Sequence, residues 1–127
     1  MAHMDEYINN IVKLRAEADE LPDDNPGSLL RKINLLTTCL MYIGRVSSQV
    51  DGDYKRCYAQ RKYEQAKAHR EATKDKAASA EIAVYDLRIQ EAELYQSMSR
   101  WRNALSSTTE ELHALKLKLR IDFQQGA

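Results

Sequence analysis

The sequence predicts an all-α fold: a long antiparallel helical hairpin of coiled-coil type, with a short N-terminal helix that forms a three-helix bundle at one end. Three observations support this fold class. The 127 residues include only two prolines and four glycines, and both prolines fall within residues 22–26. Residues that favour helices, such as Ala, Leu, Glu, Lys, Gln and Arg, are abundant. Apolar residues recur at alternating spacings of four and three, as they do in helices that pack along a partner.

Residues 1–4 are expected to be an expression scar, followed by a single helical domain over residues 5–127. The first helix is predicted over residues 5–21. Its apolar residues follow the four–three spacing: Tyr7, Ile11, Leu14, Ala18 and Leu21. Residues 22–28 contain both prolines and one glycine, so we expect a turn there that sets the next helix antiparallel to the first.

The second helix is predicted over residues 29–73, with Asn25 or Ser28 as its cap. We call its line of regularly spaced residues the seam: Leu29, Ile33, Leu36, Leu40, Ile43, Ser47, Val50, Tyr54 and Cys57. The spacing does not slip at Gly52, which favours one continuous helix and leaves a bend there open. Three more apolar residues widen the face of the first half: Leu30, Met41 and Val46. Two partner helices are therefore expected beside that half.

The third helix is predicted over residues 79–123. No glycine or proline marks the preceding reversal, so its place stays open within residues 73–79. The seam of this helix comprises Ala80, Val84, Leu87, Glu91, Leu94, Met98, Trp101, Leu105, Thr108, Leu112, Leu115 and Leu119. A second apolar stripe on this helix cannot be buried by the same partner helix that covers the seam. We therefore expect a homodimer that associates through Ile82, Tyr85, Ile89 and Tyr95.

The cysteines and the hydropathy indicate a cytoplasmic protein. Cys39 and Cys57 lie on one predicted helix, about 27 Å apart at 1.5 Å per residue. A disulfide needs Cα atoms within about 7 Å, so both are expected to be free thiols in a reducing compartment. No apolar run approaches the ~20 residues that span a bilayer, so no membrane partner is expected.

The sequence shows no constellation for catalysis. It has no glycine-rich phosphate loop, no Cys-x-x-Cys pair and no His-Glu-x-x-His run. His69 and His113 fall on different predicted helices and are expected to be solvated. Glu91 at a seam position is interpreted as one half of an interhelical ion pair with Arg61 or Arg56. We therefore predict a protein that is not an enzyme, with no catalytic residue, metal, cofactor or small-molecule substrate.

Charge is unevenly placed although the net charge is zero. Residues 5–28 carry seven acids and two bases, whereas residues 55–76 carry eight bases and three acids. Tyrosines are interleaved with the bases, a pattern that suits a phosphate backbone with unpaired bases. The candidate binding residues are Lys55, Arg56, Tyr58, Arg61, Lys62, Tyr63, Lys67, Arg70 and Lys74. Two other interpretations stay open: an ordinary solvated helix face, or a surface that meets the acidic first helix of another protomer.

Four stretches carry a resemblance to a known group of proteins. RWRNALSSTTE (residues 100–110) and ALKLK (residues 114–118) resemble the C-terminal half of small uncharacterised coiled-coil proteins from phages and prophages of Gram-positive bacteria. LLRKINLL (residues 29–36) and YAQRK (residues 58–62) are similar to their N-terminal half. Such genes lie in recombination and replication clusters. The resemblance therefore implies DNA metabolism in the cytoplasm of an infected or lysogenic bacterial host, with no catalytic motif to carry over.

Three functional hypotheses follow. The first is an interaction protein that binds a DNA recombination or replication partner, or single-stranded DNA, through a basic two-helix arm that includes residues 54–76. The second is a phage inhibitor of a host defence nuclease, comparable to an anti-CRISPR protein, whose acidic first helix engages a basic groove. The third is a structural or scaffold component of the virion. The sequence leaves open the identity of the partner, the binding of DNA and the oligomeric state.

Overall fold

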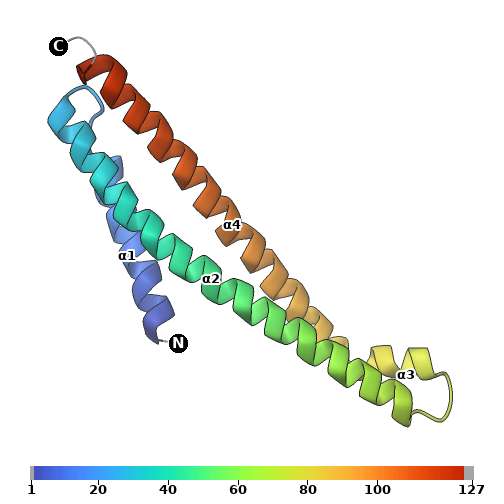
Figure 1. Ribbon diagram of the computed structural model, residues 1–127. Coiled ribbons are helices and arrows are strands. Elements are labelled where there is room, and N and C mark those ends of the chain that lie inside the picture. The colour runs from blue at the N-terminus through green and yellow to red at the C-terminus, as the bar shows by residue number, and fades with distance from the viewer. Residues whose placement is uncertain (1, 125–127) are drawn as a thin grey trace. The chain divides into compact units, whose positions relative to one another are not determined.

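The computed structural model describes residues 2–124 (Figure 1). Every regular element in this part of the chain is a helix, which confirms the predicted all-α bundle. The elements are α1 (Ala2–Asp19), α2 (Pro26–Glu71), α3 (Lys76–Ala83), α4 (Tyr85–Leu119) and the π-helix η1 (Arg120–Gln124). The chain forms two compact units, and α2 contributes to both. The first unit comprises Met1–Ser47 and Trp101–Ala127, and the second comprises Ser48–Arg100.

The first unit packs α1, the N-terminal part of α2 and the C-terminal part of α4 around one hydrophobic core. The buried residues of this core are Ala18, Leu29, Ile33, Leu36, Leu112 and Leu115, and Leu35, Leu40, Leu119 and Phe123 pack against it. In Figure 1, α1 and α2 run antiparallel, as do α2 and α4. The Cys39 thiol also donates a hydrogen bond to the carbonyl of Ile11, 3.8 Å away on α1.

The start of α2 identifies Asn25 as the cap. Its Oδ1 accepts a hydrogen bond of 2.8 Å from the backbone N–H of Ser28. Its carbonyl accepts a second bond, of 3.1 Å, from the N–H of Leu29. Pro26 occupies the first helical position, where the missing N–H costs nothing because that group has no partner inside the helix. The helix therefore begins three residues before the predicted position at 29.

Of the three residues that were predicted to widen the apolar face of α2, one is buried and two are exposed. Val46 is fully buried, but Leu30 and Met41 are 50% and 47% exposed. Cys39 takes part in the packing instead and is 1% exposed. The reason is direction: Cys39 lies on the side of α2 that faces α1, whereas Leu30 and Met41 lie on the side that faces water.

The second unit packs the C-terminal part of α2 against α3 and the N-terminal part of α4. Helix α2 passes through Gly52 without interruption, as the unbroken spacing predicted. Five of the predicted seam residues are buried here, namely Val50, Cys57, Ala80, Val84 and Met98, and Arg61 is buried beside them. The Cys57 thiol donates a hydrogen bond to the carbonyl of Leu87, 3.8 Å away. Both cysteines are free thiols, as their separation along α2 predicted.

The reversal between α2 and α3 takes place over residues 72–75. Asp75 has φ 43°, in the left-handed region, and its carbonyl accepts the N–H of Ser79 at 2.9 Å. Aspartate is one of the few residues other than glycine that adopts this conformation readily. This explains how the chain turns without the glycine or proline that the sequence lacks there.

The third predicted helix, residues 79–123, is divided in the structure. Val84 interrupts it with φ −108° and ψ 15°, and its N–H reaches the carbonyl of Glu81 at 3.3 Å. The helix resumes at once, because the Val84 carbonyl accepts the N–H of Arg88 at 2.9 Å. The seam keeps its spacing across the interruption, since Ala80 and Val84 are both buried. Side-chain periodicity therefore carries no signal of the break.

Candidate nucleic-acid interface

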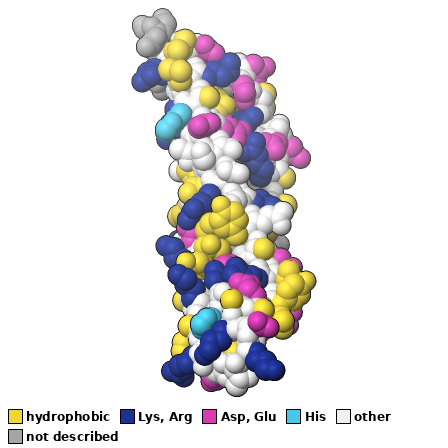
Figure 2. Space-filling model, turned by 90° about the vertical axis from the view of Figure 1, so that its right-hand side faces the viewer, with side chains coloured by type: hydrophobic (Ala, Val, Ile, Leu, Met, Phe, Trp, Pro, Cys, Tyr) yellow, Lys and Arg dark blue, Asp and Glu magenta, His cyan; other side chains and the backbone are white. Residues whose placement is uncertain are grey.

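Four of the predicted basic residues lie on the side of α2 that points away from the seam. Since a helix advances about 100° per residue, Lys55, Lys62 and Arg70 fall within about 80° of one another, and Lys67 lies about 60° further round. Cys57 and Arg61 lie on the opposite side. We call the exposed face the basic surface and define it by four cations: Lys55, Lys62, Lys67 and Arg70. Figure 2 shows Lys and Arg side chains gathered around hydrophobic ones in its lower part, where Figure 1 draws α3 and the end of α2.

The four cations of the basic surface are exposed. Within residues 2–124 none of the four forms an ion pair with a carboxylate. Lys74 is also exposed but lies after the end of α2, in the reversal. Arg56 is exposed and donates a hydrogen bond of 2.6 Å to Asp53, which offsets its charge. On this part of α2, the charge available to a ligand is therefore concentrated on the four cations.

Arg61 does not belong to the basic surface, although the sequence placed it among the candidate binding residues. It is buried at the seam and donates two hydrogen bonds to Glu91, of 2.8 and 3.1 Å. A third, of 2.9 Å, goes to Gln65. These contacts decide between the two partners considered for Glu91, because Arg56 bonds to Asp53 on its own helix. The hydrogen bond from Arg61 lowers the pKa of Glu91, and the same contact raises the pKa of Arg61.

A chain of polar contacts continues from Arg61 toward α3. Gln65 donates a hydrogen bond of 3.0 Å to Glu81, and Glu81 accepts two more from Arg88, of 2.8 and 2.6 Å. The bonds from Arg88 lower the pKa of Glu81. The chain therefore joins α2, α3 and α4 across the interruption at Val84. This network was not predicted from the sequence, although the spacing of Glu81 and Arg88 by seven residues is typical of side chains on one helical face.

Three tyrosines, Tyr54, Tyr58 and Tyr63, lie near the basic surface, and the first two have aromatic rings or cations against them. Tyr54 contacts Tyr95 of α4 edge to face, with ring centroids 5.6 Å apart, and lies 6.3 Å from Tyr58. The Tyr58 ring has two cations at 5.1 Å from its centroid, those of Arg61 and Lys62. The contacts of Tyr54 are favourable ring–ring contacts, and the two cations beside Tyr58 form favourable cation–π contacts.

Two surface hollows border Ala66. The first is lined by Tyr63, Ala66, Lys67 and Arg70, all from α2. The second lies between α2 and α3 and is lined by Lys62, Gln65, Ala66, His69, Ala77, Ala80 and Glu81. The first hollow has no carboxylate among its lining residues, whereas the second includes Glu81. An anionic group therefore meets only favourable charges in the first.

The predicted self-association residues are exposed in the second unit. Ile82 is 77% exposed, Tyr85 64% and Ile89 46%. Ile82 and Tyr85 line a shallow hollow together with Glu81 and Asp86. Tyr95, at 54%, is exposed too, but one side of its ring contacts Tyr54. The apolar stripe thus faces solvent, on either side of the interruption at Val84.

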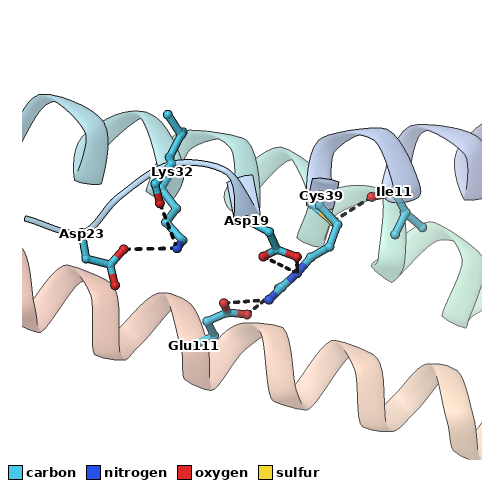
Figure 3. A network of polar contacts seen from close by, with 8 residues as sticks. Ile11, Asp19, Asp23, Lys32, Cys39 and Glu111 are labelled. Carbon is cyan, nitrogen blue, oxygen red and sulfur yellow. Dashed lines mark hydrogen bonds and ion pairs between the residues drawn. The ribbon is translucent and has the colours of Figure 1, made fainter. Parts of the chain in front are cut away.

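Some acidic residues of α1 and of the turn that follows it form ion pairs within the first unit. Arg15 of α1 forms two hydrogen bonds with Glu111 of α4, of 2.5 and 2.9 Å, and one of 3.3 Å with Asp19. Lys32 of α2 bonds to Asp23 at 3.1 Å (Figure 3). These contacts join α1 to α4 and α2 to the turn after α1, and they engage two of the seven acids of residues 5–28.

No alternative chemistry emerges from the described residues. Residues 2–124 contain no group of three His, Cys, Asp or Glu side chains placed to hold a metal ion. His69 and His113 are exposed, as expected. Burial raises the pKa of both the Cys39 and the Cys57 thiols. A raised pKa disfavours the thiolate, which is the nucleophilic form, so neither thiol is activated.

Comparisons with protein-family models, curated proteins and solved structures returned no match for this chain. Among residues 2–124, none of the helices combines the length and the apolar character needed to cross a bilayer.

Proposed function

We propose that the chain is a non-catalytic coiled-coil interaction protein of phage origin that binds DNA through the basic surface of α2. The observation that carries this proposal is the set of four exposed cations, Lys55, Lys62, Lys67 and Arg70, on the solvent-facing side of α2. The stretches that resemble proteins from phage recombination and replication clusters support a DNA-handling setting. The two buried free thiols are compatible with the reducing cytoplasm of a bacterial host.

Electrostatics supplies the mechanism. DNA binding releases the counterions that the phosphates hold, and each cation that neutralises a phosphate adds to the dependence on salt. Four contacts predict a slope of log K against log salt of about −3 for a single strand. Cooperative or extended binding would steepen the slope. Arg61 contributes nothing to it, because its charge is already matched by Glu91.

The variant Lys62→Glu/Lys67→Glu/Arg70→Glu is expected to lose DNA binding at least tenfold. Reversing three charges removes most of the attraction and adds repulsion from the phosphates. The measurement is fluorescence anisotropy with a labelled oligonucleotide at low and moderate salt. The matched control reverses three exposed cations of the first unit, Lys13→Glu/Arg31→Glu/Lys116→Glu. Equal affinity in both variants, or no binding by the unmodified protein at low salt, would contradict the proposal.

We also propose a homodimer through Ile82, Tyr85, Ile89 and Tyr95, supported by the exposure of the first three side chains. A stripe this short buries less than the ~800 Å² per partner of a standard interface, so the dissociation constant is expected to be micromolar. The change Ile82→Lys/Ile89→Lys places charges in this contact. It should yield a monomer in sedimentation equilibrium at concentrations where the unmodified protein is dimeric.

The control for the dimer is Val12→Lys/Leu117→Lys, which alters two exposed apolar residues of the first unit. It should leave the dimer intact. A monomeric unmodified protein at tens of micromolar, or dissociation by the control as well, would contradict this part of the proposal.

Two further hypotheses from the sequence stay predictions: an inhibitor of a host defence nuclease, and a virion scaffold. A pull-down from host lysate followed by mass spectrometry separates them from the proposed function. Recovery of a defence nuclease favours the inhibitor, and regular high-order assembly in light scattering favours the scaffold.

A further inference from the structure

The tyrosines near the basic surface differ in how much of each ring is exposed to solvent and free of neighbouring groups. Tyr58 is 38% exposed, and the cations of Arg61 and Lys62 lie 5.1 Å from its centroid. Tyr54 is engaged by the rings of Tyr58 and Tyr95. Tyr63 is 64% exposed. It is therefore the one of these three whose ring offers most of its surface to a ligand.

Tyr63 also lines the hollow with the most favourable charge. The lining residues Tyr63, Ala66, Lys67 and Arg70 stand at i, i+3, i+4 and i+7, so they share one face of α2. Ala66 has the smallest side chain of the four and leaves space between the tyrosine and the two cations. The hollow thus combines an open aromatic ring, an apolar floor and two positive charges within two helical turns.

We propose that this hollow is a subsite for one unpaired nucleobase, which stacks on Tyr63 while the neighbouring phosphates contact Lys67 and Arg70. The inference rests on the proposed function and deepens it, because it predicts that the basic surface prefers single-stranded DNA to duplex DNA. A base inside a duplex is already stacked on both faces and cannot reach Tyr63. Phosphates of a duplex remain accessible to the cations. Tyr63 therefore determines the preference for single strands, whereas the cations determine the affinity for either form.

The test compares a single-stranded oligonucleotide with a duplex of the same length by fluorescence anisotropy. The unmodified protein is expected to prefer the single strand. Tyr63→Ala should weaken single-strand binding about tenfold and leave duplex binding unchanged, since stacking of a base on an aromatic side chain contributes on that scale. Tyr63→Phe keeps the ring and should keep the preference. Photocrosslinking of an oligonucleotide that carries 5-bromodeoxyuridine should label the tryptic peptide of residues 63–67.

Val12→Ala is the control, because Val12 is 63% exposed and lies in the first unit, outside both the basic surface and the dimer contact. It should leave the ratio of single-strand to duplex affinity unchanged. Binding of both forms with a ratio that Tyr63→Ala does not alter overturns the subsite while the proposed function stands. An equal loss in both forms also overturns it. No binding of either oligonucleotide overturns the proposed function and the subsite together.

Discussion

Replacing Leu36 by alanine is expected to lower the free energy of unfolding of the first unit by about 3 kcal/mol. Leu36 is fully buried in the core between α1, α2 and α4. Its truncation removes apolar contacts and leaves a cavity, for which losses of about 2–5 kcal/mol are typical. A three-helix core of this size has few neighbours that can move inward to fill the space. The loss should therefore fall in the middle of that range.

Urea denaturation followed by tryptophan fluorescence measures this loss. The single tryptophan, Trp101, belongs to the same unit as Leu36 and reports on its unfolding. Leu30→Ala is the matched control, because Leu30 is a leucine of the same helix that is half exposed. The control should change stability by less than ~0.5 kcal/mol. Equal losses in the two variants would show that Leu36 is not in the core.

Replacing Arg61 by alanine is expected to lower the free energy of unfolding of the second unit by about 2 kcal/mol. The change leaves the Glu91 carboxylate at the seam without its two hydrogen bonds. Breaking a fully buried pair costs about 3–5 kcal/mol. The side chains of Arg61 and Glu91 keep 11% and 14% of their surface exposed, so water reaches the carboxylate and reduces this cost. The double change Arg61→Met/Glu91→Leu removes both charges and should recover most of the stability.

The contribution of this pair depends on pH in a defined direction. The pKa of Glu91 is lowered in the folded state by the hydrogen bond from Arg61. Its stabilising effect is therefore complete above the ordinary glutamate pKa of about 4.3 and is lost as pH falls through the lower pKa of the folded state. The difference in unfolding free energy between the unmodified protein and Glu91→Gln should shrink below about pH 4. Circular dichroism at 222 nm during urea titrations from pH 3 to 7 measures it.

Arg88→Ala serves as the control for the ion pair at Arg61. Arg88 and Glu81 are also joined by two hydrogen bonds, but both side chains are largely exposed. Exposed pairs of this kind contribute little because water and salt screen them. If Arg88→Ala were as destabilising as Arg61→Ala, burial would not be the cause of the larger effect.

Part of the basic surface follows from the sequence. The charge count places Lys55, Lys62, Lys67 and Arg70 in a basic stretch, and in the structure all four side chains are exposed. The sequence also assigned Arg61 two roles, as a DNA ligand and as a partner for Glu91. Only the opposing helix resolves this, because a guanidinium four residues beyond Cys57 lies on the seam and meets the carboxylate of α4 there. Likewise, the sequence gives no reason to separate Tyr58 from Tyr63, whereas the structure shows that two cations lie against the ring of Tyr58.

The sequence by itself determined that the chain is helical, which residues line the seam, and that α2 continues through Gly52. These features follow from a local rule: apolar side chains at alternating spacings of four and three share one helical face. The tertiary structure alone decided the interruption at Val84, the division into two units, the exposure of Leu30 and Met41, and the pairing of Arg61 with Glu91. The exposure of Leu30 and Met41 and the pairing of Arg61 depend on which side chains of another helix lie opposite, and periodicity within one helix carries no information about its partner. The interruption at Val84 leaves the spacing of the seam unchanged, so periodicity does not reveal it either.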